Sequence, residues 1–250
     1  VRAWLNGTLP PQPLPARAAP PEAKILPEGV VETPFWFGDG QFGMLSRPAS
    51  GKTGQILLIG NGGIDSLQGG QGNDILRGGT GNDSLNITGD VTVNKLDVAL
   101  NGNVTQTSGT LTASGAASIN AGVGSVSLTS GTNDFQSTLA VSGNNIAITD
   151  KNALTLSTVT ATGTLDIIAG GNINAVSVSA TDTATFNAAG NDILVSSGTF
   201  NASASFNGRN VNVTTTGGLQ FGDSNITGTL TANTSGPITD SGALTVAGTT

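Results

Sequence analysis

The chain of 250 residues contains no cysteine, no histidine and no tyrosine, and these absences exclude several kinds of chemistry. Without histidine there is no Ser-His-Asp triad, and without histidine or cysteine there is no zinc site of the usual type. Missing cysteine also removes disulfides, which suits a long exported solenoid that needs no covalent cross-links. No apolar run approaches the ~20 residues of a membrane-spanning helix. There is no signal peptide at Val1, and the chain stops in mid-pattern, so we expect a piece of a longer protein.

Basic residues are scarce as well. Nine Lys and Arg stand against 16 Asp and Glu, which gives a net charge of −7. The imbalance lies in residues 60–250, where 4 basic residues face 12 aspartates and no glutamate. Because phosphate binding needs clustered Lys and Arg, we expect no nucleic-acid partner.

Proline is confined to one end of the chain, with 9 of the 10 prolines in residues 1–48. Proline at this density favours extended chain without helix or sheet pairing, so residues 1–50 are interpreted as an irregular linker. The aromatic segment VVETPFWFGDGQFGML at 30–45 offers an alternative, a cap over the end of the following domain.

From about residue 51 the chain is rich in Gly, Asn, Ser and Thr, with short apolar residues at every second position, as in VSVSA and VNVTT. Alternation with period 2 between Gly/Asn turns predicts short strands, and no window indicates a helix. In 91–250 an apolar–Gly/Asn–apolar pattern recurs at 20–26 residues, and LDVALNGNVTQTSGTLTASG (96–115) returns as LTANTSGPITDSGALTVAG at 230–248. This period predicts a solenoid of at least five parallel coils.

Three nonapeptides occupy residues 60–86: GNGGIDSLQ, GGQGNDILR and GGTGNDSLN. In each nonapeptide the sixth residue is aspartate and the eighth is leucine, which we expect to pack inside on a short strand. Glycine permits the positive φ angles of a tight turn whose carbonyls point inward, and the aspartate adds a charged oxygen. An upstream segment, GKTGQILLI (51–59), keeps two glycines and Leu58 in register but has Ile56 in place of the aspartate.

The nonapeptides resemble the RTX family, the haemolysin-type calcium-binding repeats of bacterial secreted proteins. Asn61, in place of the second glycine, is the one departure in the core of the motif. The resemblance implies calcium as the ion, and calcium accepts 6–8 oxygen ligands with loose geometry, whereas magnesium is stricter. The predicted metal-binding residues are Asp65, Asp74, Asp83, Gly60, Gly62, Gly69, Gly72, Asn73, Gly78, Gly81 and Asn82. If successive turns alternate between the two sides of a flattened roll, Asp65 and Asp83 flank one complete site and Asp74 contributes at best to a weak one.

Segments such as ITDSGALTVAGTT are similar to the repeats of filamentous-haemagglutinin-like exoproteins and other large bacterial adhesins, over about residues 91–250. This resemblance implies a right-handed parallel β-helix. We therefore expect an all-β chain of three parts: a proline-rich segment (1–50), a calcium-binding parallel β-roll (51–90) and a β-helical solenoid (91–250). The expected protein is a non-catalytic, secreted or surface-exposed exoprotein with a structural and adhesive role. Its partners would be calcium and host or neighbouring-cell glycans or proteins.

Three alternatives compete with parts of this interpretation. A carbohydrate-active β-helix, such as a polysaccharide lyase or hydrolase, would need paired carboxylates near Lys151 or Arg209 in one groove. The threonines of STVTATGT (157–164) could bind ice only if they recurred in line on every coil. The pentapeptide GNDIL at 190–194 repeats residues 72–76 but has no nine-residue neighbour, so we expect it at a solenoid corner rather than at a metal.

Overall fold

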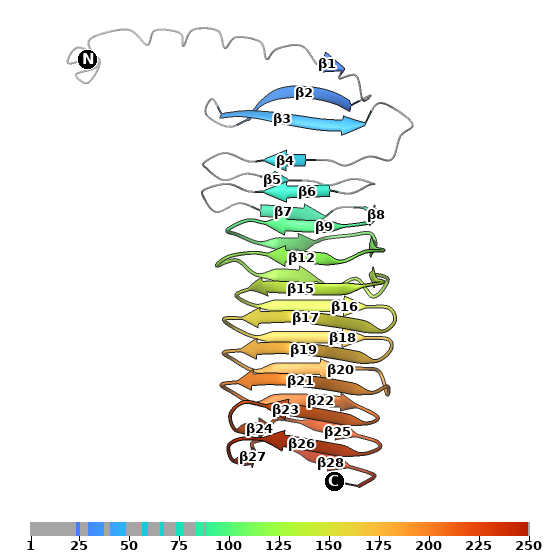
Figure 1. Ribbon diagram of the computed structural model, residues 1–250, viewed down its shortest axis with the longest axis vertical. Coiled ribbons are helices and arrows are strands. Elements are labelled where there is room, and N and C mark those ends of the chain that lie inside the picture. Colours follow the sequence, from blue (N-terminus) through green and yellow to red (C-terminus); the bar gives the residue numbers. More distant parts are fainter. Residues whose placement is uncertain are drawn as a thin grey trace, which may run out of the picture.

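The computed structural model is a rod of stacked β-coils (Figure 1). It describes residues 84–87 and 89–249 with their side chains, and the strands between residues 24 and 77 by their backbone alone. Within these parts of the chain there is no helix, so none of the described segments could cross a bilayer as an apolar helix.

From residue 96 to residue 208 each coil contributes one strand to each of two long sheets, and each of the last two coils adds a second strand to one of them, sheet B. Sheet A, with 13 strands in spatial order, contains β1 (Lys24–Ile25), β2 (Val30–Phe37), β3 (Gln41–Pro48), β4 (Leu57–Ile59), β6 (Asp74–Arg77), β9 (Leu96–Ala99), β12 (Ala117–Asn120), β15 (Thr138–Gly143), β17 (Leu154–Ala161), β19 (Ile173–Ala180), β21 (Ile193–Phe200), β23 (Val211–Thr215) and β26 (Leu230–Thr234).

Sheet B, with 12 strands, runs back along the opposite side of the rod: β5 (Ser66–Leu67), β7 (Ser84–Ile87), β10 (Val104–Gln106), β13 (Val126–Leu128), β16 (Ile146–Asp150), β18 (Leu165–Ala169), β20 (Ala184–Asn187), β22 (Ala204–Gly208), β24 (Leu219–Phe221), β25 (Ser224–Ile226), β27 (Ile238–Asp240) and β28 (Leu244–Val246). A short sheet C adds a third side to three coils with β8 (Val91–Val93), β11 (Leu111–Ala113) and β14 (Asp134–Phe135).

Strands of successive coils pair in parallel, and eight coils begin in sheet A from β9 to β26. The predicted all-β fold with at least five parallel coils is therefore confirmed. The long echo between 96–115 and 230–248 also has a structural counterpart. Both segments form coils with three strands, β9–β10–β11 and β26–β27–β28, whereas each of the coils from β15 to β22 has two.

Most coils are shorter than the period read from the sequence. Between β12 and β21, the longest step from one strand to the next in sheet A takes Ala117 to Leu139, and the shortest takes Leu139 to Leu156. Successive occurrences of the recurring pattern lie in different sheets: LAVSG at 139–143 lies in β15 of sheet A, but LDIIA at 165–169 forms β18 of sheet B. Each change of sheet added part of a coil to the apparent period.

Antiparallel pairing occurs at one end of sheet A. The strands β2 and β3 pair along their whole length, from Val30↔Pro48 to Phe37↔Gln41, and β3 joins β4 through Ser46↔Leu57. Residues 30–48 therefore extend the sheet, in contrast to the linker expected from their proline content. The β-branched and aromatic residues of VVETPFWF favour a strand.

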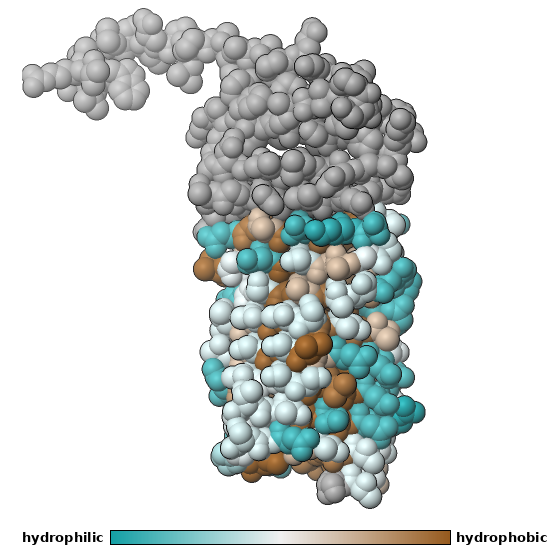
Figure 2. Space-filling model, in the orientation of Figure 1, coloured by the Kyte–Doolittle hydropathy of each residue, from teal (hydrophilic) through white to brown (hydrophobic). Residues whose placement is uncertain are grey.

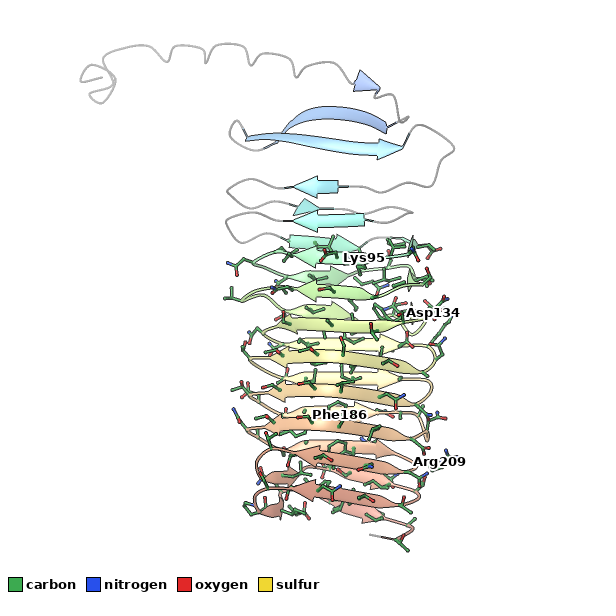
Figure 3. All side chains as sticks on the ribbon, in the orientation of Figure 1. Lys95, Asp134, Phe186 and Arg209 are labelled. Atoms are coloured by element: carbon green, nitrogen blue, oxygen red, sulfur yellow. The ribbon has the colours of Figure 1, made fainter. Side chains whose placement is uncertain are left out.

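The core is a continuous apolar column between the sheets. Inward and outward residues alternate, as in β18, where Leu165, Ile167 and Ala169 are buried between more exposed neighbours. Four buried phenylalanines follow one another near the C-terminal end of the described rod. Phe186 and Phe206 are paired in register and stack at 5.4 Å between ring centroids, with 6° between their planes. Figure 3 shows Phe186 near the middle of its coil, whereas Asp134 and Arg209 lie at one edge of the rod.

Candidate functional sites

The predicted calcium ligands lie almost entirely outside the described residues. This holds for Asp65, Asp83, Gly60, Gly62, Gly69, Gly72, Asn73, Gly78, Gly81 and Asn82, and Asp74 begins β6, of which only the backbone is described. Their role at a metal stays a prediction.

The strands that follow these turns are described, and they alternate between the sheets as expected. The strand of the first nonapeptide, β5, pairs with β7 of the third, with Ser66↔Ser84 and Leu67↔Leu85 in sheet B. The strand of the second, β6, lies in sheet A and pairs with β4 of the degenerate upstream block. Consecutive nonapeptides therefore form half-coils, and the first and third are neighbours along the rod.

A buried polar cluster closes sheet C. Asp150 is 1% exposed, and its Oδ1 accepts the backbone N–H of Phe135 in β14 at 2.8 Å. Because β14 is the edge strand of sheet C, the carboxylate occupies the place where a further strand would have supplied a carbonyl. The other oxygen, Oδ2, accepts the N–H of Asn152 at 3.2 Å. Asp150 thus caps the edge at which the three-sided coils give way to two-sided ones.

Asp134 lies beside this cap and carries the ion pair of the cluster. Lys151 Nζ is 2.8 Å from Asp134 Oδ2, which also accepts a hydrogen bond from Gln136 Nε2, and Oδ1 accepts one from Asn152 Nδ2. Burial opposes ionisation of Asp134, but the hydrogen bonds from Gln136, Lys151 and Asn152 outweigh it and lower its pKa. Burial raises the pKa of Asp150, and the negative charge of Asp134 adds to this effect against the hydrogen bonds from Phe135 and Asn152.

This cluster is the arrangement that the carbohydrate-active alternative called for, two aspartates and Lys151 brought together. Sequence reasoning missed it, since no recognisable motif surrounds Lys151. However, all four carboxylate oxygens accept hydrogen bonds from protein donors, and both aspartates are at most 5% exposed. An acid/base pair for glycoside hydrolysis must reach substrate and water on its two sides. The geometry is that of a strand-edge cap.

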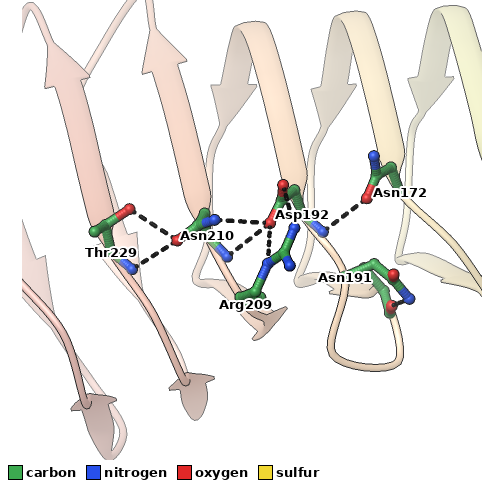
Figure 4. A network of polar contacts seen from close by, with 7 residues as sticks. Asn172, Asn191, Asp192, Arg209, Asn210 and Thr229 are labelled. Carbon is green, nitrogen blue, oxygen red and sulfur yellow. Dashed lines mark hydrogen bonds and ion pairs between the residues drawn. The ribbon is translucent and has the colours of Figure 1, made fainter.

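The pentapeptide GNDIL at 190–194 forms a corner that leads into β21, as expected from its isolation in the sequence (Figure 4). The Asp192 carboxylate binds the Arg209 guanidinium through both oxygens, with Nε to Oδ1 and Nη2 to Oδ2 both 2.9 Å. Oδ1 also accepts the backbone N–H and the side-chain amide of Asn210. The hydrogen bond from the Arg209 guanidinium is the main cause of the lowered pKa of Asp192; burial opposes it, and the charge of Arg209 and the hydrogen bonds from Asn210 lower the pKa further. Both carboxylate oxygens of Asp192 therefore accept hydrogen bonds from residues one coil further along the chain.

The same corner shows a ladder of side-chain oxygens along the rod (Figure 4). Asn172 Oδ1 accepts the N–H of Asp192, Asp192 Oδ1 that of Asn210, and Asn210 Oδ1 that of Thr229, at 3.0–3.2 Å. Each residue stands immediately before a strand of sheet A. The recurrence of Asn, Asp or Thr before an apolar strand, at the spacing of one coil, is the sequence signal that could have identified this ladder.

The fold and its corner ladders define a β-solenoid repeat protein. Three consecutive segments, 71–142, 143–205 and 208–250, match the family described as Repeats of unknown function (DUF5649), and together they make up most of the chain. The protein therefore belongs to this family. No curated protein and no solved structure matched the chain.

Proposed function

We propose that the protein is an exported, non-catalytic rod with a structural and adhesive role at the bacterial cell surface, whose first coils are ordered by calcium. The resemblance of 60–86 to RTX repeats and of 91–250 to haemagglutinin-like adhesins supports this proposal. The solenoid fold and the membership in a repeat family agree with an elongated scaffold.

The observation that carries the calcium assignment is the pairing Ser66↔Ser84. Asp65 and Asp83 directly precede these residues in the sequence, and we infer that they are counterparts on adjacent coils, one strand spacing of ~4.8 Å apart. At the corner of Asp192 the counterpart one coil on is Asn210, next to Arg209, and together they neutralise and bind the carboxylate. For Asp65 the counterpart is a second carboxylate. Two like charges at this distance disfavour ionisation of both unless a cation lies between them.

Calcium fits this position better than magnesium. The donors available from such turns are carboxylate and backbone carbonyl oxygens, and calcium takes 6–8 of these with loose geometry. Asp74 has no second carboxylate as its counterpart on a neighbouring coil. Its partner one coil on is Leu96, and the register Leu57↔Ile75 assigns Ile56 as its counterpart one coil back. We therefore expect one complete site, between Asp65 and Asp83.

The proposed location follows from the expected affinity. One aspartate per turn gives a site few charges, so binding should fall in the range of extracellular modules, with Kd ~10⁻⁴–10⁻³ M. Such a site stays empty in a cytoplasm low in calcium and fills after export, when it adds to the folding free energy. Glycans or proteins of host or neighbouring cells are the proposed adhesion partners.

The test is a calcium titration of the full chain by calorimetry, with circular dichroism and thermal unfolding in calcium and in chelator. We expect Asp65→Ala and Asp83→Ala each to abolish most of the binding heat and of the calcium-dependent stabilisation. Asp74→Ala should have a small effect. Asp192→Ala is the matched control, since it removes the aspartate of an identical GNDIL sequence and should leave calcium binding unchanged. Equal losses from all four variants would contradict the paired site, and a wild-type chain without a calcium response would remove the metal from the proposal.

A further inference from the structure

The outer face of sheet A differs from the rest of this acidic chain in carrying almost no charge. The sequences of β12, β15, β17, β19, β21 and β23 contain no Asp, Glu, Lys or Arg. Their outward side chains are mainly Ser, Thr and Asn, and in β9 Asp97 adds one carboxylate at the end of the face. Figure 2 shows this face as mostly pale, with apolar groups near its middle and strongly hydrophilic side chains along one edge. Protein interfaces are likewise poor in charge at the centre and polar at the rim.

A ridge rises on this face because three neighbouring strands share a β-bulge. Between β15 and β17 the register changes from Leu139↔Leu156 to Val141↔Val159, so β17 holds one extra residue. The extra residue persists in β19 and β21 and is lost at β23. A bulge breaks the inward–outward alternation. In β19 it turns both Val176 and Ser177 outward, and Val176 is 56% exposed.

A hollow lies beside the ridge, over β12, β15 and β17, of which only β17 contains the bulge. Its volume is about 200 Å³, and it is lined by Ser118, Ile119, Asn120, Ala140, Val141, Ser142, Thr158 and Thr160 of β12, β15 and β17. A second exposed apolar side chain, Leu194 at 38% exposure, lies in the neighbouring strand β21, just before the bulge of that strand. The face therefore presents an apolar projection on β19 and, side by side with it, a hollow over β12, β15 and β17.

We propose that this face binds a second copy of the chain in a side-by-side, antiparallel dimer, with the ridge of each copy against the hollow side of the other. A twofold axis that runs parallel to the strands, over the middle of β17, would lay β19 of one copy over β15 of the second, and β21 over β12. Interfaces of this kind are self-complementary, which is the commonest symmetry of oligomers.

The register brings the matching side chains together, because this axis keeps each residue at its position along the strand. Val176 precedes Ser177, whose partner on β17 is Thr158, so it stands near the middle of the face. The residue of β15 at the same position is Ala140, which lies between the two register points of that strand and lines the hollow. The small side chain of Ala140 leaves room for the valine.

Leu194 meets a small residue in the same way. It belongs to a row across the sheet that continues through Asn174 and Thr155 to Thr138. The pair Ala117↔Leu139 extends this row to Ala116, an exposed residue directly before β12. Both exposed apolar side chains, Val176 and Leu194, therefore face an alanine of the other copy in the proposed dimer.

Size and charge also favour a second copy as the occupant. The seven strands from β9 to β23 cover ~34 Å along the rod at ~4.8 Å each, and about 20 Å across it, roughly 700 Å². A standard interface uses about 800 Å² per partner. Two chains with a net charge of −7 repel each other, but a face whose one charged side chain, Asp97, lies at its end lets them approach at low electrostatic cost.

The test is sedimentation velocity of the full chain over a concentration series, in calcium and again in chelator. We expect the wild type to pass from monomer to dimer. Val176→Asp puts a carboxylate on the ridge and Ala140→Lys puts an ammonium in the hollow. Each should weaken dimerisation at least about tenfold, equivalent to about 1.4 kcal/mol. Mixing the two variants should restore association, because in the mixed dimer the new aspartate faces the new lysine. Val123→Asp is the matched control, since Val123 is 72% exposed in the loop after β12 and should not affect the dimer.

Three results would overturn this proposal: a wild type that stays monomeric throughout, a Val123→Asp variant that weakens association as much as Val176→Asp, or a mixture of the two face variants that does not associate. The circular dichroism of each variant verifies its fold. The calcium proposal is tested separately, because the face from β9 to β23 does not include the nonapeptides. If the chain does not dimerise in calcium, the calorimetric titration still shows whether calcium binds. The two proposals can therefore fail independently.

Discussion

Replacing Phe206 by alanine tests the packing of the solenoid core. Phe206 is fully buried in β22, where its ring stacks on Phe186 and makes edge contacts with Phe221 at 5.9 Å and Phe200 at 6.4 Å between centroids. A buried Phe→Ala substitution costs about 3–5 kcal/mol of folding free energy. Each aromatic pair contributes ~0.5–1.5 kcal/mol beyond the apolar area that it buries. With three aromatic neighbours and coils on both sides to hold the cavity open, we expect about 4 kcal/mol.

Urea unfolding measures the total loss, and hydrogen exchange followed by mass spectrometry locates it. In a solenoid each coil contacts only its neighbours, so protection should fall in β20, β22 and β24 and stay unchanged in β10. Thr185→Ala is the control, because Thr185 points outward from β20 next to the same ring stack. A loss below about 1 kcal/mol would refute the packed ladder. A loss spread evenly over the rod would refute the nearest-neighbour reasoning.

Two further predictions concern the ion pairs. The lowered pKa of Asp134 means that its stabilising effect is present above the unfolded pKa of about 3.9 and is lost as the pH falls through the lower folded value. Lys151→Met should therefore cost about 1 kcal/mol near neutral pH, allowing for screening of a half-exposed lysine, and much less in acid, which urea unfolding at two pH values would reveal. Arg209→Ala removes a guanidinium exposed at 57%, so the unfolding midpoint should move only slightly and the difference should vanish in high salt. A large, salt-independent shift would show that this pair has a greater role than the structure indicates.

The all-β solenoid could be predicted from the sequence because its signals are local. A strand of four to eight residues shows its period of 2 directly, and each Gly/Asn corner lies next to the strand that it introduces. The same locality explains why GNDIL at 190–194 was identified as a corner. The strand alternation of the nonapeptides followed from their length, since nine residues suffice for one turn and one short strand.

The contacts between coils could not be read in the same way, because they join residues about one coil apart. Asp134 and Lys151 lie on successive coils, and so do Asp192 and Arg209. Neither pair forms a local motif, and the length of a coil changes along the rod, so no fixed spacing identifies the partner. The end of sheet C depends on such a contact, the cap that Asp150 provides for Phe135, and it was not predicted.

The corner at 190–194 shows why a corner motif alone does not define a metal site. In the described corner, the column Asn172, Asp192, Asn210 and Thr229 contains one carboxylate among neutral side chains, and Arg209 balances its charge. The oxygens of this column accept N–H groups and leave no net charge to neutralise. Asp65 precedes β5 in the sequence and Asp83 precedes β7, and these two strands are paired. This pairing predicts a column with two carboxylates and no basic residue at these two positions. We therefore expect the composition of the column one coil before and one coil after, rather than the pentapeptide itself, to decide whether a corner needs a cation.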